Sequence, residues 1–282
     1  MKNLILVVNK DKDYTSRDVV NKLSIILNIK KIGHTGTLDP MATGVLVCLT
    51  NKYTKLVDLI TSFEKEYIAE IKLGILTDTL DITGNVLNTV DVKNYEEKHL
   101  QEVLNSFVGV YHQTVPIYSA KKVNGKKLYE YARNNEIVEL PKNDVLIKEI
   151  ELLEYKLDTI KFRVVVSKGT YIRSLIESIT SALGTIGVMS SLVRTKQGNF
   201  KLADSYTLEE IASQEYSSVK LEDCLDLEII QIMNSELEKK IINGNKLTME
   251  YEGFVLFKKN DLDIALYYFE ENIGKLKILF TN

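Results

Sequence analysis

The hydrophobic pattern of the sequence changes near residue 213, and this change most constrains the fold. Before it, short apolar strands such as residues 4–8 and 67–73 alternate with amphipathic helices such as the one that starts at Thr170. After it, a helix-like ELEKKIINGNKL precedes three β-rich pieces, GFVLFKK, DIALYYFEE and GKLKILFTN. We therefore predict an α+β domain over residues 1–220 and a small β-rich domain over residues 221–282.

Composition and length describe an ordinary globular chain. Of the 282 residues, 45% are hydrophobic and 27% charged, and the sequence lacks the run of about 18 apolar residues that a membrane span needs. The N-terminus reads as an opening strand and not as a secretion signal. Cys48 and Cys224 lie far apart without metal-ligand neighbours, so we expect both to be reduced and structural. These features predict a cytoplasmic protein.

The loop GHTGTLDPMATGVLVCLT, residues 33–50, raises a question about its carboxylate. Asp39 is the only acid between Asp18 and Asp58, and it precedes a proline. Such an aspartate is either a turn residue, which satisfies local backbone groups, or a chemical reagent. The loop lacks the spacing of a phosphate-binding loop, and the scattered histidines His34, His99 and His112 argue against a metal site. A Ser-His-Asp arrangement is not excluded by spacing, although the sequence has no G-x-S-x-G motif.

Basic residues concentrate in one short segment of an otherwise acidic chain. The net charge is −3, yet residues 119–133 carry five basic residues against one acid, a local charge of +4. The basic residues are Lys121, Lys122, Lys126, Lys127 and Arg133. They interleave with tyrosines, so the segment is either a solvated helix face or a nucleic-acid contact, in which cations meet phosphates and aromatic rings meet bases.

Six blocks of the sequence, in order, resemble the TruB family of tRNA pseudouridine synthases. The loop matches every fixed position of G-H-x-G-x-L-D-P-x-A-x-G-x-L from Gly33 to Leu46. The other blocks are KEYIAEIKLG (65–74), TDTLDITG (77–84), YSAKKVNGKKLYEYAR (118–133), SKGTYIRSL (167–175) and LVRTKQGNF (192–200). The likeness covers residues 4 to about 213. It implies a mixed, mainly antiparallel sheet in the catalytic domain, an inserted RNA-binding segment over about residues 60–135, and a C-terminal domain similar to PUA domains.

The resemblance implies isomerisation of uridine to pseudouridine at position 55, in the T-loop of tRNA. No group is imported and nothing is oxidised, so neither a cofactor nor a metal is required. Asp39 would attack C1′ of the sugar or C6 of the base, and the sequence leaves both routes open. An ionised carboxylate enclosed with a base needs a fixed cation, and Arg173 is the matching residue. Tyr67 would stack on the base and relay a proton, and the base must first be flipped out of the RNA.

The resemblance also implies a set of substrate-binding residues. His34 would fill the space that the flipped base vacates or remain a structural histidine, and Leu192 would form an apolar lid or simply pack in the core. The remaining RNA-binding residues implied by the matched blocks are Lys10, Thr37, Tyr118, Lys121, Lys122, Lys126, Lys127, Arg133, Lys168, Tyr171 and Arg194. We expect a monomer that acts on the T-arm of tRNA without a guide RNA or an obligate protein partner.

The chain departs from the family pattern at four places outside the catalytic set. Asp11 stands where the early block has proline, and Val193 where the closing motif has arginine. The 115–119 block is one residue short, and 187–189 reads G-V-M in place of G-A-H. Three rival functions stay open at this point: an RNA chaperone without catalysis, a guide-RNA-dependent synthase, and an enzyme acting on a small molecule.

Overall fold

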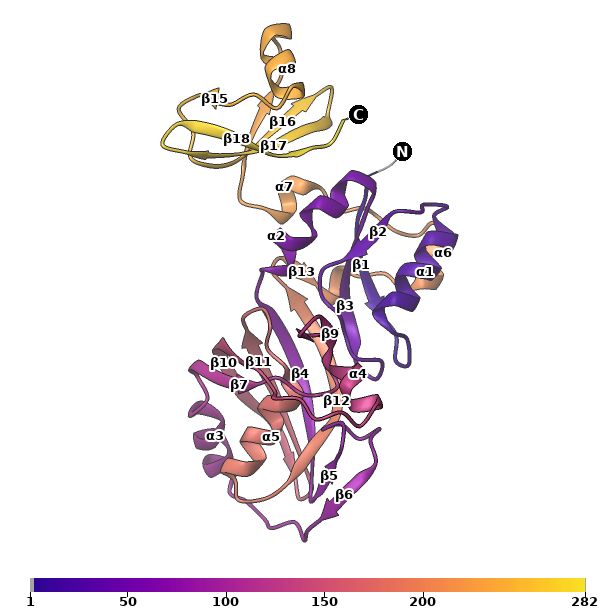
Figure 1. Ribbon diagram of the computed structural model, residues 1–282, viewed down its shortest axis with the longest axis vertical. Helices are drawn as coiled ribbons and strands as arrows, with labels where there is room; N and C mark the ends of the chain where they lie inside the picture. The colour runs from indigo at the N-terminus through magenta and orange to yellow at the C-terminus, as the bar shows by residue number, and fades with distance from the viewer. Residues whose placement is uncertain (1–2, 282) are drawn as a thin grey trace.

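The protein, described over residues 3–281 by a computed structural model, contains two main β-sheets (Figure 1). The larger sheet has nine strands, in the order β1-β3-β12-β4-β11-β10-β7, with β2 beside β3 and β13 beside β12. Its strands are β1 (Ile5–Lys10), β2 (Ile32–His34), β3 (Thr43–Thr50), β4 (Lys65–Leu73), β7 (Gly109–Thr114), β10 (Lys142–Lys156), β11 (Thr159–Val166), β12 (Gly187–Gln197) and β13 (Phe200–Lys201).

Pairing in the larger sheet is antiparallel except between β12 and β3, so the predicted mixed, mainly antiparallel sheet is confirmed. Strand β12 joins the N-terminal strands to the rest of the sheet, yet its sequence did not predict a strand. The register against β4 shifts after Met189 and again after Arg194. These irregularities interrupt the period-two alternation by which a strand is recognised.

One face of the sheet is covered by helices. Along β4, every second side chain from Lys65 to Leu73 is buried. Helices α3 (Glu97–Asn105) and α5 (Ile172–Ala182) pack on this face, with Leu100, Leu104 and Leu175 in a shared hydrophobic cluster. Figure 1 shows both helices beside β7, β10 and β11. The apolar stripes read from the sequence therefore form the core of this part of the molecule.

The N-terminal helix α1 (Ser16–Ile26) begins with a side-chain cap. Thr15 is its N-cap, and Thr15 and Asp18 form a reciprocal capping box. Val19 and Leu23 of α1 pack with Leu6 of β1 and with α6 (Leu208–Ala212). Backbone hydrogen bonds from residues 206 and 219 cover the outer edge of β1. A helix η1 (Asn51–Leu56) and helix α2 (Val57–Thr61) connect β3 to β4.

Parts of residues 60–135 lie off the larger sheet. They are a hairpin of β5 (Ile75–Thr77) and β6 (Val86–Thr89), a hairpin of β8 (Lys122–Val123) and β9 (Lys126–Lys127), and helix α4 (Leu128–Arg133). Strands β4 and β7 of the same range belong to the larger sheet. The range is therefore not a separate insertion throughout, because only the stretches around the two hairpins and α4 leave the sheet.

The C-terminal residues form a five-stranded sheet in the order β14-β16-β17-β18-β15. Its strands are β14 (Glu228–Gln231), β15 (Leu247–Thr248), β16 (Gly253–Lys259), β17 (Leu262–Glu270) and β18 (Ile273–Leu279), accompanied by α7 (Leu221–Cys224) and α8 (Ser235–Ile242). The sheet lies at one end of the molecule (Figure 1). Tyr53 of η1 fixes it there, because its hydroxyl bonds Asp263 and its ring meets Phe280 edge-on at 5.2 Å.

Two further predictions concern single features. Cys48 and Cys224 are both free and buried, as expected for structural cysteines. Among the helices of residues 3–281, none combines the length and the apolar character that crossing a membrane requires.

Candidate active site

The loop that carries Asp39 is held from three sides. Ser16, the first residue of α1, accepts a hydrogen bond from the Leu38 backbone N–H at 2.9 Å. Lys10 Nζ and the Asp13 backbone N–H donate to the Pro40 carbonyl at 3.1 and 2.8 Å. The Asp39 backbone is thus fixed between two anchored neighbours, so its side chain projects from a rigid loop.

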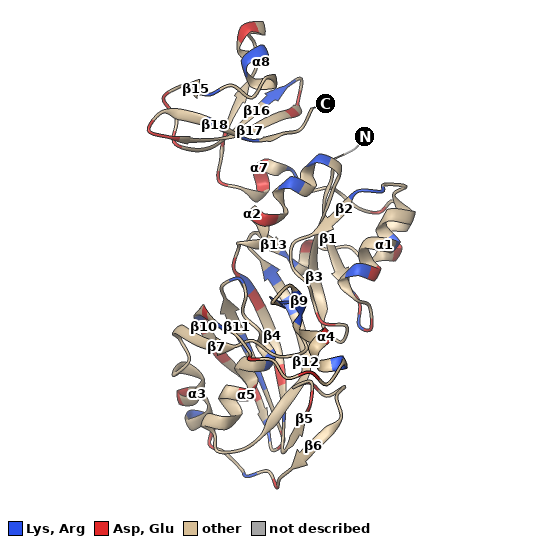
Figure 2. Ribbon diagram, in the orientation of Figure 1, with Lys and Arg blue, Asp and Glu red and all other residues tan. Residues whose placement is uncertain are grey.

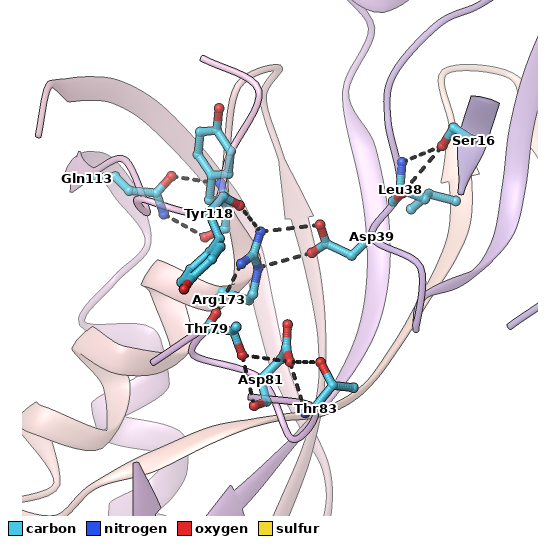
Figure 3. Close-up of polar contacts among 10 residues, drawn as sticks. Ser16, Leu38, Asp39, Thr79, Asp81, Thr83, Gln113, Tyr118 and Arg173 are labelled. Atoms are coloured by element: carbon cyan, nitrogen blue, oxygen red, sulfur yellow. Dashed lines mark hydrogen bonds and ion pairs between the residues drawn. The ribbon is translucent and has the colours of Figure 1, made fainter. Parts of the chain in front are cut away.

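The Asp39 carboxylate pairs with the Arg173 guanidinium through two contacts (Figure 3). Arg173 Nε lies 3.0 Å from Oδ2, and Arg173 Nη2 donates to Oδ1 at 3.2 Å. The Arg173 side chain is 7% exposed and the Asp39 side chain 32%. A turn aspartate would bind local backbone N–H groups, whereas this carboxylate binds a residue 134 positions away. The geometry therefore favours the reagent over the turn.

Arg173 is itself fixed by its position near the start of α5 and by two carbonyl groups. Its Nη1 donates to the Thr79 carbonyl at 3.0 Å, and its Nη2 donates to the Tyr118 carbonyl at 2.9 Å. Gln113 of β7 holds the start of the helix, because its side-chain amide exchanges two hydrogen bonds with the backbone of Tyr171, at 2.8 and 2.7 Å. A guanidinium that is fixed by two carbonyl groups can hold both oxygens of the Asp39 carboxylate in one orientation.

Asp81 is a residue of the site that the sequence reasoning did not single out. Its Oδ1 accepts from Thr79 Oγ1 at 2.9 Å and from the Thr83 backbone and hydroxyl at 3.0 and 2.5 Å. This turn presents the Thr79 carbonyl to Arg173 (Figure 3). The signal was present in the matched block TDTLDITG, whose two aspartates flank the turn.

Tyr67 and Leu192 form an apolar floor beside Asp39. Both side chains are 6% exposed and both line the same cleft, which has a volume of about 590 Å³. Tyr67 lies on β4 opposite Arg194 of β12. Leu192 lies two residues before Arg194 on β12. The structure thus brings Asp39, Tyr67 and Arg173 to one cleft, together with Leu192, as the resemblance implied.

Two of the residues expected to contact RNA are buried in this structure. Lys10 and Arg194 are both 0% exposed. Lys10 Nζ uses its three donors on the carbonyls of Asp11, Tyr14 and Pro40, at 2.9, 2.6 and 3.1 Å, and burial lowers the pKa of this lysine to about 8. Arg194 donates to the carbonyls of Val45 and Gly36 at 2.6 and 3.1 Å. Both cations therefore brace the loop and its neighbouring strands.

Part of the basic segment 119–133 lines the cleft, through residues 119–121 and Tyr129. In Figure 2, blue segments of the ribbon, which mark Lys and Arg, lie around β9 near the middle of the molecule. Lys126 pairs with Glu136 at 2.6 Å, and Lys127 and Arg133 both lie over the Tyr129 ring, at 5.3 Å from its centroid. Lys121 and Lys122 are exposed and make no ion pair or ring contact within residues 3–281. They are therefore the two lysines of the segment most available to a ligand.

The remaining predicted residues divide between the cleft and its border. Thr37, Tyr118, Lys121, Lys168 and Tyr171 line the cleft, whereas His34 lies outside the lining. His34 Nδ1 accepts from the Gly36 backbone N–H at 3.4 Å, and burial, with Arg194 and Arg17, lowers its pKa. A neutral imidazole at this border is suited to stacking or hydrogen bonding and not to pairing with phosphate.

The chemistry of the cleft follows from these contacts. A carboxylate partly open to solvent is paired with a buried guanidinium, next to an aromatic ring and a leucine. Such a site accepts a planar apolar group and presents a nucleophile to it. Within residues 3–281 there is no group of three or more His, Cys, Asp or Glu side chains placed to hold a metal ion.

Comparisons with known proteins identify the family of this chain. A model of the family described as TruB family pseudouridylate synthase (N terminal domain) matches residues 24–172. A tRNA pseudouridine synthase B from Mesoplasma florum is 37% identical over 98% of this chain and 96% of its own length. One from Staphylococcus saprophyticus is 41% identical over 98% and 97%. A chain of a Cbf5-Nop10-Gar1 complex superposes with a TM-score of 0.70 and 25% identity, over 94% of this chain and 78% of that chain.

Sheet topology and the solved neighbour define the fold as that of a pseudouridine synthase. The chain belongs to the TruB family of pseudouridylate synthases.

Proposed function

We propose that the protein isomerises uridine to pseudouridine at position 55, in the T-loop of tRNA. Asp39 acts as the nucleophile on a flipped-out base, Arg173 holds its carboxylate, and Tyr67 stacks on the base and relays a proton. The observation that carries this proposal is the two-contact Asp39–Arg173 pair beside the floor formed by Tyr67 and Leu192. The names of the relatives support tRNA as the substrate.

The chain acts as a monomer in the cytoplasm, without a guide RNA, a cofactor or a protein partner. Support comes from the curated relatives, which match over nearly the full length of both chains. We further propose that residues 1–220 form the catalytic domain and residues 221–282 a PUA-like RNA-binding domain. The separate five-stranded sheet is consistent with that division.

The direct test replaces Asp39 and maps pseudouridine in a tRNA transcript. The variant Asp39→Asn keeps the size of the side chain and removes the nucleophile, so we expect modification to be abolished while tRNA binding remains. Asp91→Asn, at an exposed aspartate in the loop before α3, is the matched control and should modify at the wild-type rate. Pseudouridine formed by Asp39→Asn would end the catalytic assignment.

Three outcomes separate the proposal from its rivals. Binding of tRNA without modification by the wild type would identify an RNA chaperone. Modification that requires an added guide RNA would identify a guide-dependent synthase. Turnover of free uridine would identify a small-molecule enzyme. We expect the purified protein to modify a bare transcript and to leave free uridine unchanged.

A further inference from the structure

The cleft carries more positive charge than its own carboxylate balances. Among the described residues that line it, five are cations and Asp39 is the one acid; the cations are Lys65, Lys121, Lys168, Arg173 and Arg194. Arg173 is paired with Asp39. Uncompensated charge in a poorly solvated site is unfavourable unless a ligand of opposite sign arrives. The cleft is therefore prepared for an anion in addition to a base.

Lys65 is the cation most closely tied to the floor of the cleft. It lies two residues before Tyr67 on β4 and faces the same side, so the two side chains are about 7 Å apart along the strand. Lys65 Nζ donates to the carbonyls of Thr61 and Phe63, both at 3.0 Å. An ammonium has three donors, so one N–H remains for a ligand in the cleft that Lys65 lines.

Two further cations surround Lys65. Lys168 lies in the loop between β11 and α5, where its side chain is exposed and lines the cleft. The side chains of Arg194 and Lys65 both approach Gly36. A Cβ at Gly36 would lie 3.5 Å from Arg194 Nη1 and 3.5 Å from Lys65 Cε. Burial, then Arg194 and Lys168, lowers the pKa of Lys65 to about 8. Arg194 contributes charge from below, while Lys65 and Lys168 can touch a ligand.

We propose that Lys65 and Lys168 form a subsite for a backbone phosphodiester of the nucleotide whose base stacks on Tyr67. In RNA, a base and its flanking phosphates are joined through one ribose. The distance between a base and its phosphate is therefore similar to the spacing of about 7 Å between Tyr67 and Lys65 along β4. The buried positive charge is then paired with a phosphate when RNA binds. This pairing favours a nucleotide whose phosphate reaches the two lysines over one that is placed differently in the cleft. This subsite rests on the proposed function, since it assumes that the cleft receives a nucleotide of RNA.

The first experiment measures RNA affinity at several salt concentrations, with a T-arm hairpin as the probe. Lys168→Met removes an exposed cation, so folding is not at risk, and it should weaken binding roughly tenfold. It should also lower the salt dependence by about one phosphate contact. Lys98→Met, on the exposed surface of α3, is the matched control and should leave both quantities unchanged. An unchanged salt dependence in Lys168→Met would overturn the subsite.

The second experiment identifies the anion by replacing single phosphates flanking the target uridine with neutral methylphosphonates. One of these replacements should weaken wild-type binding about as much as Lys168→Met does, and should cause little further loss in that variant. Fully additive losses would show that the lysine and the phosphate do not meet. Inorganic phosphate is tested as a competitor of the hairpin. If it competes as strongly as unlabelled RNA does, the site is a general anion site and the proposal is refuted.

The pH dependence of binding distinguishes a ligand contact of Lys65 from a structural role. Wild-type affinity should fall between pH 8 and 9 more steeply than that of Lys65→Met, because the free ammonium loses its proton in this range. Equal pH profiles would remove Lys65 from the subsite. Pseudouridine formation by the wild type on the unmodified hairpin is measured in parallel. If it fails, the proposed function fails, whereas normal catalysis with unchanged lysine variants refutes the subsite alone.

Discussion

Arg173→Lys tests whether the shape of the guanidinium, and not only its charge, orients Asp39. Arg173 makes four contacts: 3.0 and 3.2 Å to Asp39, 3.0 Å to the Thr79 carbonyl and 2.9 Å to the Tyr118 carbonyl. A lysine ammonium is a single point with three donors and cannot reach acceptors spread around a planar fork. We expect at least two contacts to be lost, at about 1 kcal/mol each, so stability should fall by about 2 kcal/mol.

The effect on catalysis should exceed the effect on stability. A carboxylate that keeps a cation nearby but loses its two-contact alignment is displaced from the attacking position, and a displacement of about 1 Å can reduce a rate about 100-fold. The assay is single-turnover pseudouridine formation at saturating enzyme, together with urea unfolding. We expect a rate loss of that order with tRNA affinity within about twofold of wild type.

Arg163→Lys is the matched control for this experiment. Arg163 of β11 also holds carboxylates, with contacts of 3.0 Å to Glu66, 2.7 Å to Glu149 and 3.2 Å to Glu151, but it lies outside the cleft. Its replacement should change stability by at most about 1 kcal/mol and leave the rate unchanged. A wild-type rate in Arg173→Lys, or an equal rate loss in both variants, would refute the orientation argument.

Two further predictions concern the scaffold around the loop. Gly44→Ala should destabilise the protein by about 2 kcal/mol or more and lower the urea midpoint, because Gly44 has φ +101° and a Cβ there would lie 2.3 Å from the Arg194 carbonyl oxygen. Lys10 has a pKa of about 8 in the folded protein and of 10.5 in the unfolded chain. Between these two pH values the unfolded chain therefore binds more protons than the folded protein. Unfolding free energy should therefore rise from pH 8 to 10.5 more steeply, by up to about 1.4 kcal/mol per pH unit, in wild type than in Lys10→Met. Equal slopes would contradict this.

Elements with a regular pattern were predictable, and interrupted ones were not. Strand β4 and helix α5 have clear apolar periods, and Thr15 with Asp18 forms a capping box that can be read in the sequence. Strand β12 was missed because its two register shifts against β4 interrupt the alternation of its side chains. Local pattern rules detect regular periods, whereas a bulged strand is defined by its partners.

The candidate site divides in the same way. The sequence alone determined that Asp39 sits in a tight Gly- and Thr-rich loop and that matched blocks carry Tyr67 and Arg173. Only the tertiary structure decided that Arg173 reaches Asp39 across 134 residues, and that Lys10 and Arg194 are buried and bond backbone carbonyls. The physical reason is that residue type sets what a side chain can do, while burial and partners depend on strand order, which brings distant segments together.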